Sequence, residues 1–144
     1  MKFKSRRDIL FSFIMLGTSF VLVATSTLGI ITSKFESIPI WVHLLDGAGI
    51  VFLLWIFFGT HYELANGLLT YKSGPIKGRI KINDIREIIQ DKTLWVGLKP
   101  ATATKGLIIR FGKFYDEVYI SPQSNVLFIK ELIKLNPNIK IIQE

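Results

Sequence analysis

The chain has 144 residues, with no cysteine, two histidines and a net charge of +7 from 18 basic and 11 acidic side chains. The lack of cysteine excludes disulfides, thiolate nucleophiles and cysteine-ligated zinc, and two histidines are too few for a histidine-rich metal site. Hydrophobic residues make up 49% of the chain and concentrate in its first 60 residues, so we expect a membrane anchor and one small domain.

Two long apolar runs dominate the first part of the chain. Ile9–Ser33 contains 25 residues without a charge, and Ile40–Thr60 is interrupted only by His43 and Asp46. A helix needs about 20 apolar residues to cross the hydrocarbon core of a bilayer. The pattern therefore predicts transmembrane helices at about 9–31 and 40–60, within a membrane anchor of residues 1–61.

The flanking charges indicate how these helices are oriented. Four basic residues precede the first run, whereas the loop between the runs holds one Lys and one Glu. The positive-inside rule then predicts a cell-membrane protein with two spans and both termini in the cytoplasm. A cleaved signal peptide is the alternative, because Ala24-Thr25-Ser26 resembles a cleavage site, although the apolar run exceeds the about 7–15 residues of a signal-peptide core.

Asp46 and His43 are polar residues within the second apolar run. Ionisable residues inside a span often belong to proton relays or substrate paths, as in a transporter component. Asp46, however, lies only about two turns from the start of the span, beside Trp41, where polar and aromatic side chains reach the membrane interface. We expect an interfacial position for Asp46 and keep the functional role as the alternative.

Residues 62–144 predict a small β-rich domain. Asn66-Gly67 is a strong hairpin signal, and Gly74-Pro75 marks a second turn. Ser121-Pro122 predicts the start of an amphipathic helix that runs to Leu135 and ends at Asn136. The fold class is therefore α+β: a two-helix transmembrane hairpin, then a bent antiparallel sheet of six to seven strands capped by a C-terminal helix. The strand candidates beyond Tyr62-Glu63-Leu64 are Leu68–Ser73, Ile76–Ile82, Ile85–Asp91, Leu94–Leu98, Gly106–Phe111 and Glu117–Ile120.

The order of short motifs resembles that of bacterial PH-like domain membrane proteins, the YyaB-like PH domain family, which is related to the sublancin immunity protein. The motifs are Asp8 after a basic start, Tyr62-Glu-Leu-Ala-Asn-Gly-Leu-Leu, Ile82-Asn-Asp-Ile-Arg-Glu-Ile, Pro100-Ala101, Ile120-Ser-Pro-Gln, Phe128-Ile-Lys-Glu-Leu and Asn136-Pro-Asn-Ile. The chain departs from the family pattern at Thr102, Thr104 and Lys105-Gly106. The resemblance implies a PH-like fold in a membrane setting and implies no catalytic residue.

Basic side chains around the second turn form the candidate binding site. Lys72, Lys77 and Arg79 follow a Lys-x4-Lys-x-Arg pattern, similar to the phosphoinositide-binding pattern of eukaryotic PH domains, and Lys81 continues it. Cations around a hairpin can bracket a phosphate. The alternative is an ordinary solvated strand face, on which Lys and Arg also alternate.

No motif predicts an enzyme, a cofactor or a metal site, and no cluster of basic and stacking aromatic residues predicts nucleic-acid binding. We expect a non-enzymatic, membrane-anchored PH-like binding module at the cytoplasmic membrane face, in contact with anionic lipid or a membrane-protein partner. The alternative, implied by the resemblance alone, is an immunity protein that protects the producing cell from a bacteriocin. The sequence leaves the oligomeric state open.

Overall fold

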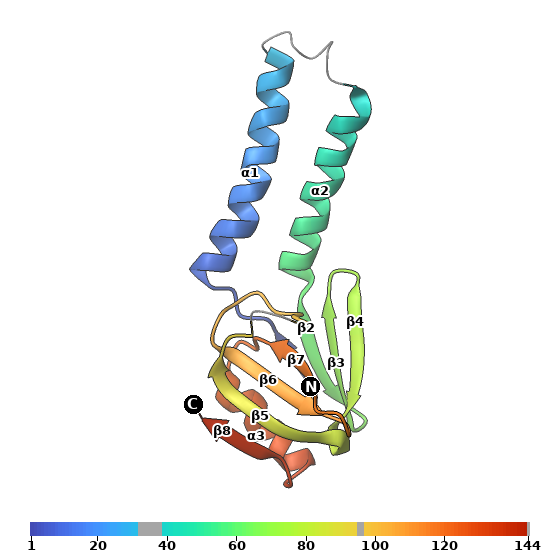
Figure 1. Cartoon of the computed structure of the whole chain (residues 1–144), viewed down its shortest axis with the longest axis vertical. Helices are drawn as coiled ribbons and strands as arrows, with labels where there is room; N and C mark the ends of the chain where they lie inside the picture. The colour runs from blue at the N-terminus through green and yellow to red at the C-terminus, as the bar shows by residue number, and fades with distance from the viewer. Residues whose placement is uncertain (32–38, 95–96, 144) are drawn as a thin grey trace.

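Two long helices stand on a β-domain (Figure 1). The computed structural model describes residues 1–31, 39–94 and 97–143. Helix α1 (Ile9–Ile31) leads away from the domain and α2 (Ile40–Gly59) returns to it, so the domain lies where α1 begins and α2 ends. Both apolar segments form helices, as predicted, and their crossing of a membrane stays a prediction.

The outer surfaces of α1 and α2 are apolar and uncovered. Phe13, Phe20 and Leu44 are 79%, 73% and 68% exposed, and both helices are long and apolar enough to cross a membrane. Exposed apolar area costs about 25 cal/mol per Å² in water. This surface therefore favours an apolar environment around the helix pair.

The first sheet follows α2 and consists of antiparallel strands in the order β1-β2-β3-β4. The predicted hairpin turn is confirmed: Asn66 and Gly67 have φ of 51° and 71°, as a type I′ turn requires. The predicted second turn is confirmed as well, at Gly74. The four strands are β1 (Lys2–Lys4), β2 (His61–Ala65), β3 (Leu68–Ser73) and β4 (Ile76–Lys81).

Strand β1 was not predicted, and it brings the residues before α1 into the domain. Its three residues pair with β2, from Lys2 opposite Glu63 to Lys4 opposite His61. The first sheet thus contains residues from both the predicted membrane anchor (1–61) and the predicted domain (62–144). The boundary between the two stays a prediction.

The second sheet has the order β7-β6-β5-β8, and a short 3-10 turn, η2 (Ile82–Asp84), connects it to the first. Its last strand pairs in parallel with β5, because α3 carries the chain back across the domain before β8 begins. The four strands are β5 (Ile85–Lys92), β6 (Gly106–Phe111), β7 (Asp116–Ile120) and β8 (Lys140–Gln143). The described residues form eight strands in two sheets, where the sequence predicts six to seven strands in one sheet.

Only part of the strand predicted at Leu94–Leu98 can be compared with the structure. Residues 95–96 lie outside the described residues. Of the described part, Leu98 forms an isolated bridge with Val118 and no longer ladder.

Helix α3 (Asn125–Leu135) covers the core with its apolar face, as predicted, and buries Phe128 and Leu132 completely. Its predicted start is wrong. Ser124 is the N-cap and accepts a hydrogen bond from the Leu127 amide at 3.3 Å. Ser121 cannot serve as the cap because its buried hydroxyl accepts from the Thr102 amide at 3.1 Å.

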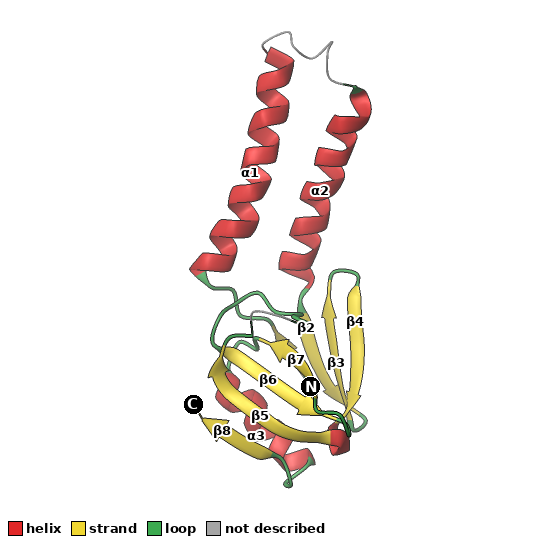
Figure 2. Ribbon diagram, viewed as in Figure 1, coloured by secondary structure: helices red, strands yellow, loops and turns green. Residues whose placement is uncertain are grey.

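The hydrophobic core lies between the inner faces of the two sheets and α3 (Figure 2). Both sheets and the helix contribute fully buried side chains, among them Tyr62, Leu69, Ile88, Leu107 and Phe128. The predicted α+β class, with two N-terminal apolar helices, a strand-rich domain and a C-terminal helix, is confirmed.

Candidate functional site

The outer face of the first sheet collects basic side chains. Alternate residues of its strands, such as Tyr62, Leu69 and Ile80, are buried in the core. The residues between them point the opposite way because side chains alternate along a strand. All four cations predicted to bind an anionic ligand are exposed there: Lys72 on β3, and Lys77, Arg79 and Lys81 on β4.

Strand pairing places four basic residues in one line across this sheet. Lys4 lies opposite His61, His61 opposite Lys72, and Lys72 opposite Lys77. Directly opposed side chains have Cβ atoms about 4.5–5.5 Å apart. We call Lys4, His61, Lys72 and Lys77 the cationic row; it contains no carboxylate to offset the charges of its three lysines.

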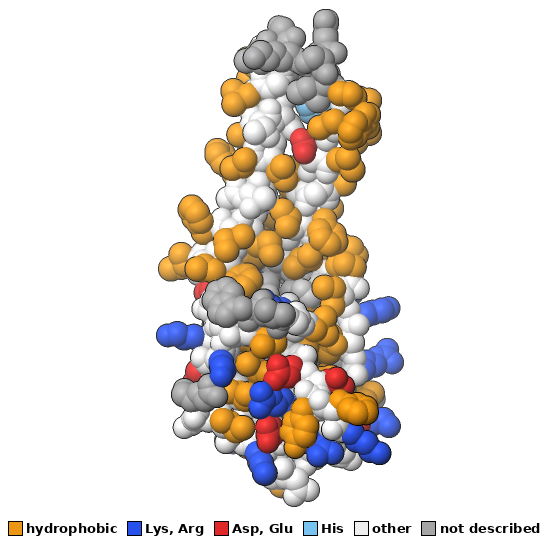
Figure 3. All heavy atoms as spheres, in the orientation of Figure 1, with side chains coloured by type: hydrophobic (Ala, Val, Ile, Leu, Met, Phe, Trp, Pro, Cys, Tyr) orange, Lys and Arg blue, Asp and Glu red, His pale blue; other side chains and the backbone are white. Residues whose placement is uncertain are grey.

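The two following rows of the same face are less uniform. The second row holds Lys2, Glu63, Thr70 and Arg79, and the third holds Ala65, Leu68 and Lys81. The paired positions of this face therefore carry six Lys or Arg side chains and one carboxylate. Figure 3 shows Lys and Arg gathered over the β-domain, whereas hydrophobic side chains cover the helices.

The cationic row lies level with the end of α2. The β3–β4 turn packs on the last turn of this helix: a Cβ atom on Gly74 would come within 2.8 Å of the Ile56 side chain. Next to this contact, the hydroxyl oxygens of Thr60 and Ser73 are 2.9 Å apart. Lys72 and Lys77 lie within one or two residues of this turn on either side. They are therefore beside the C-terminal end of the apolar helix α2.

The residues before α1 form hydrogen bonds with β2, with the loop before β6 and with the segment that follows β7. The Ser5 hydroxyl lies 3.1 Å from the Tyr62 hydroxyl and 2.9 Å from the Ser121 hydroxyl, and accepts from Thr102 Oγ1 at 2.9 Å. On the backbone, the Arg6 amide donates to the Ser121 carbonyl at 2.7 Å. These hydrogen bonds link the first sheet to the segment that follows β7.

Asp8 connects the start of α1 to the loop before β6. One carboxylate oxygen accepts from the Phe11 amide at 2.8 Å, and the other accepts from the Thr104 amide and hydroxyl at 2.6 and 2.7 Å. Partial burial by itself would raise the pKa of Asp8, but these hydrogen bonds, aided by the Arg6 charge, hold the pKa below its usual 3.8.

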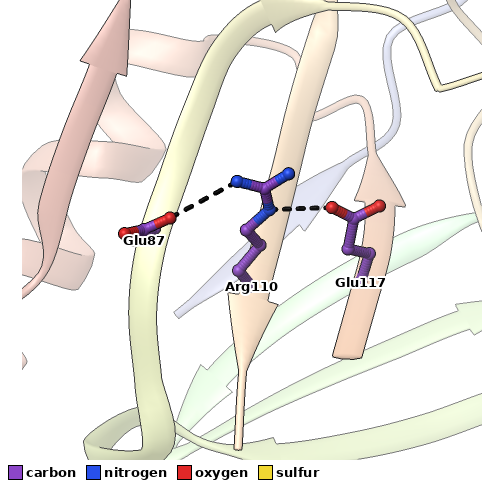
Figure 4. A network of polar contacts seen from close by, with 3 residues as sticks. All are labelled: Glu87, Arg110 and Glu117. Atoms are coloured by element: carbon purple, nitrogen blue, oxygen red, sulfur yellow. Dashed lines mark hydrogen bonds and ion pairs between the residues drawn. The ribbon is translucent and has the colours of Figure 1, made fainter. Parts of the chain in front are cut away.

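A second group of charges, on the other sheet, is already paired. Arg110 Nε donates to Glu117 at 2.7 Å and Arg110 Nη1 lies 3.4 Å from Glu87, across three neighbouring strands (Figure 4). The hydrogen bond to Glu117 is the main reason why the pKa of Arg110 rises above its usual value. No comparable ion pair holds Lys72 or Lys77 among the described residues, so their charge is available to an anionic ligand.

The predicted transmembrane polar residues lie far from this face. Asp46 accepts a hydrogen bond from Ser26 on α1 at 2.9 Å, and His43 lines the same small pocket. About 13 residues separate Asp46 from the end of α2, which corresponds to about 20 Å along the helix. Asp46 thus joins the two helices near their far ends and takes no part in the cationic face.

The sequence pattern identified the β3 and β4 cations but missed Lys4 and His61. The alternation Lys2-Phe3-Lys4 is a short strand signal, but its basic side chains are equally typical of the residues that flank a transmembrane helix. The row becomes visible only through the pairing of β1 with β2, two segments separated by both helices.

The arrangement can attract and hydrogen-bond anions, most readily phosphate groups, through ammonium and imidazole groups. It provides no set of metal ligands: the described residues include no group of three or more His, Asp or Glu side chains placed to hold a metal ion.

Comparison with known proteins places the domain in a family. The family model described as "Bacterial PH domain" matches residues 60–136. The uncharacterized protein YyaB of Bacillus subtilis (strain 168) is 32% identical over 89 residues, which are 62% of this chain and 61% of that protein. The match thus covers about three fifths of the curated relative's length, and no solved structure matches the chain. The family match spans more than half of the chain, and the chain belongs to the bacterial PH domain family.

Proposed function

We propose that this protein is a non-enzymatic, membrane-anchored binding module whose cationic sheet face contacts anionic lipid headgroups at the cytoplasmic face of the cell membrane. PH domains are generally binding modules without catalytic activity. The observation that carries the proposal is the position of the cationic row beside the last turn of α2.

The position of the cationic row along the axis of α2 supports a lipid ligand over a soluble one. The 20 residues of α2 rise about 30 Å, the thickness of a hydrocarbon core. A bilayer around α2 therefore has its headgroups near Gly59, next to Lys72 and Lys77. Each basic residue near an anionic surface gains about 1 kcal/mol.

The like charges within the row favour the same ligand. Lys72 and Lys77 oppose each other directly on neighbouring strands, and directly opposed like charges destabilise a sheet. An anionic surface would relieve this repulsion, so lipid binding would both orient the domain and stabilise the β3–β4 hairpin.

The cytoplasmic assignment rests on charge and on the contacts of residues 2–8. Pairing of β1 with β2 keeps the basic start and the domain at the same end of the helix pair. The positive-inside rule then assigns that end to the cytoplasm. These contacts also favour an uncleaved first helix, because cleavage after it would remove β1, Ser5 and Asp8 from the domain.

Lipid selectivity in a bilayer tests the proposal. We would reconstitute the full chain in bilayers of phosphatidylcholine with phosphatidylglycerol and measure, with spin-labelled lipids, the association of each lipid with the protein. We expect the wild type to prefer phosphatidylglycerol, and K72Q/K77Q to lose about fivefold of that preference per removed charge. The preference should also fall as the salt concentration rises.

The matched control is K130Q/K140Q, which removes two exposed lysines from α3 and β8, on the part of the domain far from the helices (Figure 1). It should keep the wild-type preference. Equal lipid preference in the wild type and K72Q/K77Q would contradict the proposal and would direct attention to a protein partner instead.

The bacteriocin-immunity role stays a prediction. It derives from the family resemblance alone, and the name of the Bacillus subtilis relative assigns that protein no activity.

A further inference from the structure

A second basic site lies at the junction of the helices and the domain. A cavity of about 610 Å³ opens between β1, the residues that lead into α1, and the end of α2. Basic side chains in its lining are Lys2, Lys4, Arg6, Arg7 and His61, and the lining contains no carboxylate. We call this cavity the junction pocket; it shares Lys4 and His61 with the cationic row and adds a concave space that is open to solvent.

Arg7 of the junction pocket lies against two aromatic rings. Its guanidinium carbon lies 4.7 Å from the centre of the Phe58 ring and 5.1 Å from that of Phe57. Cation–π contact with these rings restrains the guanidinium, whose N–H groups can bind a phosphate in a bidentate way.

Arg6 has a different role. Its guanidinium donates to the Thr104 and Lys105 carbonyls at 2.6 and 2.7 Å, and so anchors the segment to the loop before β6. Arg7 and Lys2 then distinguish the junction pocket from the cationic row, because neither belongs to that row.

At the helices, the lining of the junction pocket places a basic side chain beside an exposed aromatic one. Phe58 is 57% exposed and lies in the last turn of α2, while Arg7 precedes α1 by two residues. An occupant with a phosphate at Arg7 can therefore extend an apolar part past Phe58 along the helix pair.

We infer that the junction pocket binds a single phosphate-bearing anion, whose expected source is one anionic glycerophospholipid with its phosphate at Arg7 and its acyl chains beside α2. The inference builds on the proposed membrane contact and adds a discrete site of one ligand per chain. A free phosphate compound shares the same chemistry, and the experiment separates the two sources.

The test is native mass spectrometry of the delipidated full chain in a mild non-ionic detergent, titrated with phosphatidylglycerol or phosphatidylcholine. We expect one saturable phosphatidylglycerol adduct in the wild type. R7Q and K2Q should each weaken this adduct, R7Q by about tenfold or more, because it loses a charged hydrogen-bonding group. R7K should recover part of the affinity, since it restores charge without the planar fork.

The row variant K72Q/K77Q separates this inference from the proposed function. It should lose bulk lipid preference in bilayers yet keep the single tight adduct, whereas R7Q should do the reverse. K2Q changes one exposed lysine, so a failure of R7Q to fold would leave the site testable through K2Q.

A parallel titration with inorganic phosphate, followed by the ³¹P line width, identifies the source of the anion. Broadening in the wild type and K72Q/K77Q but not in R7Q, without a lipid preference, would support the site with a free anion as its ligand. An adduct of equal strength for both lipids, or one that R7Q and K2Q leave unchanged, together with no phosphate broadening, would overturn the inference.

Discussion

Single hydroxyl and carboxylate groups connect the segments of this domain. Tyr62 is fully buried; its hydroxyl donates to the Pro100 carbonyl at 2.6 Å and accepts from the Ser121 amide at 3.0 Å. The residue thereby joins β2, the loop before β6 and the segment after β7. Burial raises the pKa of Tyr62 above its usual 10.0, so the hydroxyl keeps its proton and its donor role at neutral pH.

Replacement of Tyr62 by Phe should destabilise the fold by about 1–3 kcal/mol, because it leaves a buried carbonyl and a buried amide without their partner. The ring contact with Phe128, 6.2 Å between centroids, would remain. The measurement is the free energy of unfolding of the full chain in non-ionic detergent. Y115F, which removes a hydroxyl from a 47% exposed side chain, is the control and should change little; equal losses in both variants would contradict the role given to Tyr62.

At the same scale, the sequence predicts only some residues of the candidate site. Lys77, Arg79 and Lys81 were recognisable because they alternate with apolar or small residues along one strand. Lys4 and His61 were not, because their neighbours across the sheet are set by pairing between segments almost 60 residues apart. Local alternation predicts which face of a sheet a side chain occupies. The pairing register of distant strands determines which side chains lie beside it.

The helices and strands likewise divide into those that local sequence patterns predict and those that they do not. The helices, both hairpin turns and strands β3, β4, β5, β6 and β7 follow from local periodicity and turn chemistry. Strands β1 and β8 contain three and four residues, too few for a reliable alternation, and each forms at a sheet edge. The start of α3 was misplaced because tertiary hydrogen bonds use Ser121, leaving Ser124 as the cap.

Asp8 makes the junction between α1 and the β-domain sensitive to acid. Because its pKa in the folded state lies below 3.8, its carboxylate stabilises the fold fully above that value, and this contribution is lost as the pH falls through the folded-state pKa. D8N should cost about 1–2 kcal/mol near neutral pH, since the cap and one charged acceptor are weakened.

The check is the free energy of unfolding of the wild type and D8N over a range of pH. Their difference should be constant above about pH 5 and shrink toward about pH 3. A difference that grows as the pH falls would show that the Asp8 carboxylate does not stabilise this junction.

At the scale of the whole molecule, the domain is fastened to the helix pair at two places. Residues 5–8 tie α1 to the loop before β6, and the contacts of Thr60 with Ser73 and of Gly74 with Ile56 tie α2 to the first sheet. Two attachments restrict rotation of the domain about either one. The cationic face is thus held in a fixed direction relative to the helices.

Membrane topology can be mapped directly because the chain has no cysteine. A membrane-impermeant maleimide should label F35C, between the two apolar helices, in intact cells. It should label K113C, in the domain, only after the membrane is opened, as expected for two spans with cytoplasmic ends. Labelling of K113C in intact cells would exclude the proposed orientation.

The pairing of β1 with β2 also constrains how the protein is made. Residues 2–4 leave the ribosome long before residues 61–65, and both apolar helices are synthesised between them. During translation this edge strand has no partner until the second helix has been synthesised and residues 61–65 have emerged. The sheet can therefore close only after both apolar helices have been synthesised, which makes the docking of residues 2–8 a late step in the biogenesis of the molecule.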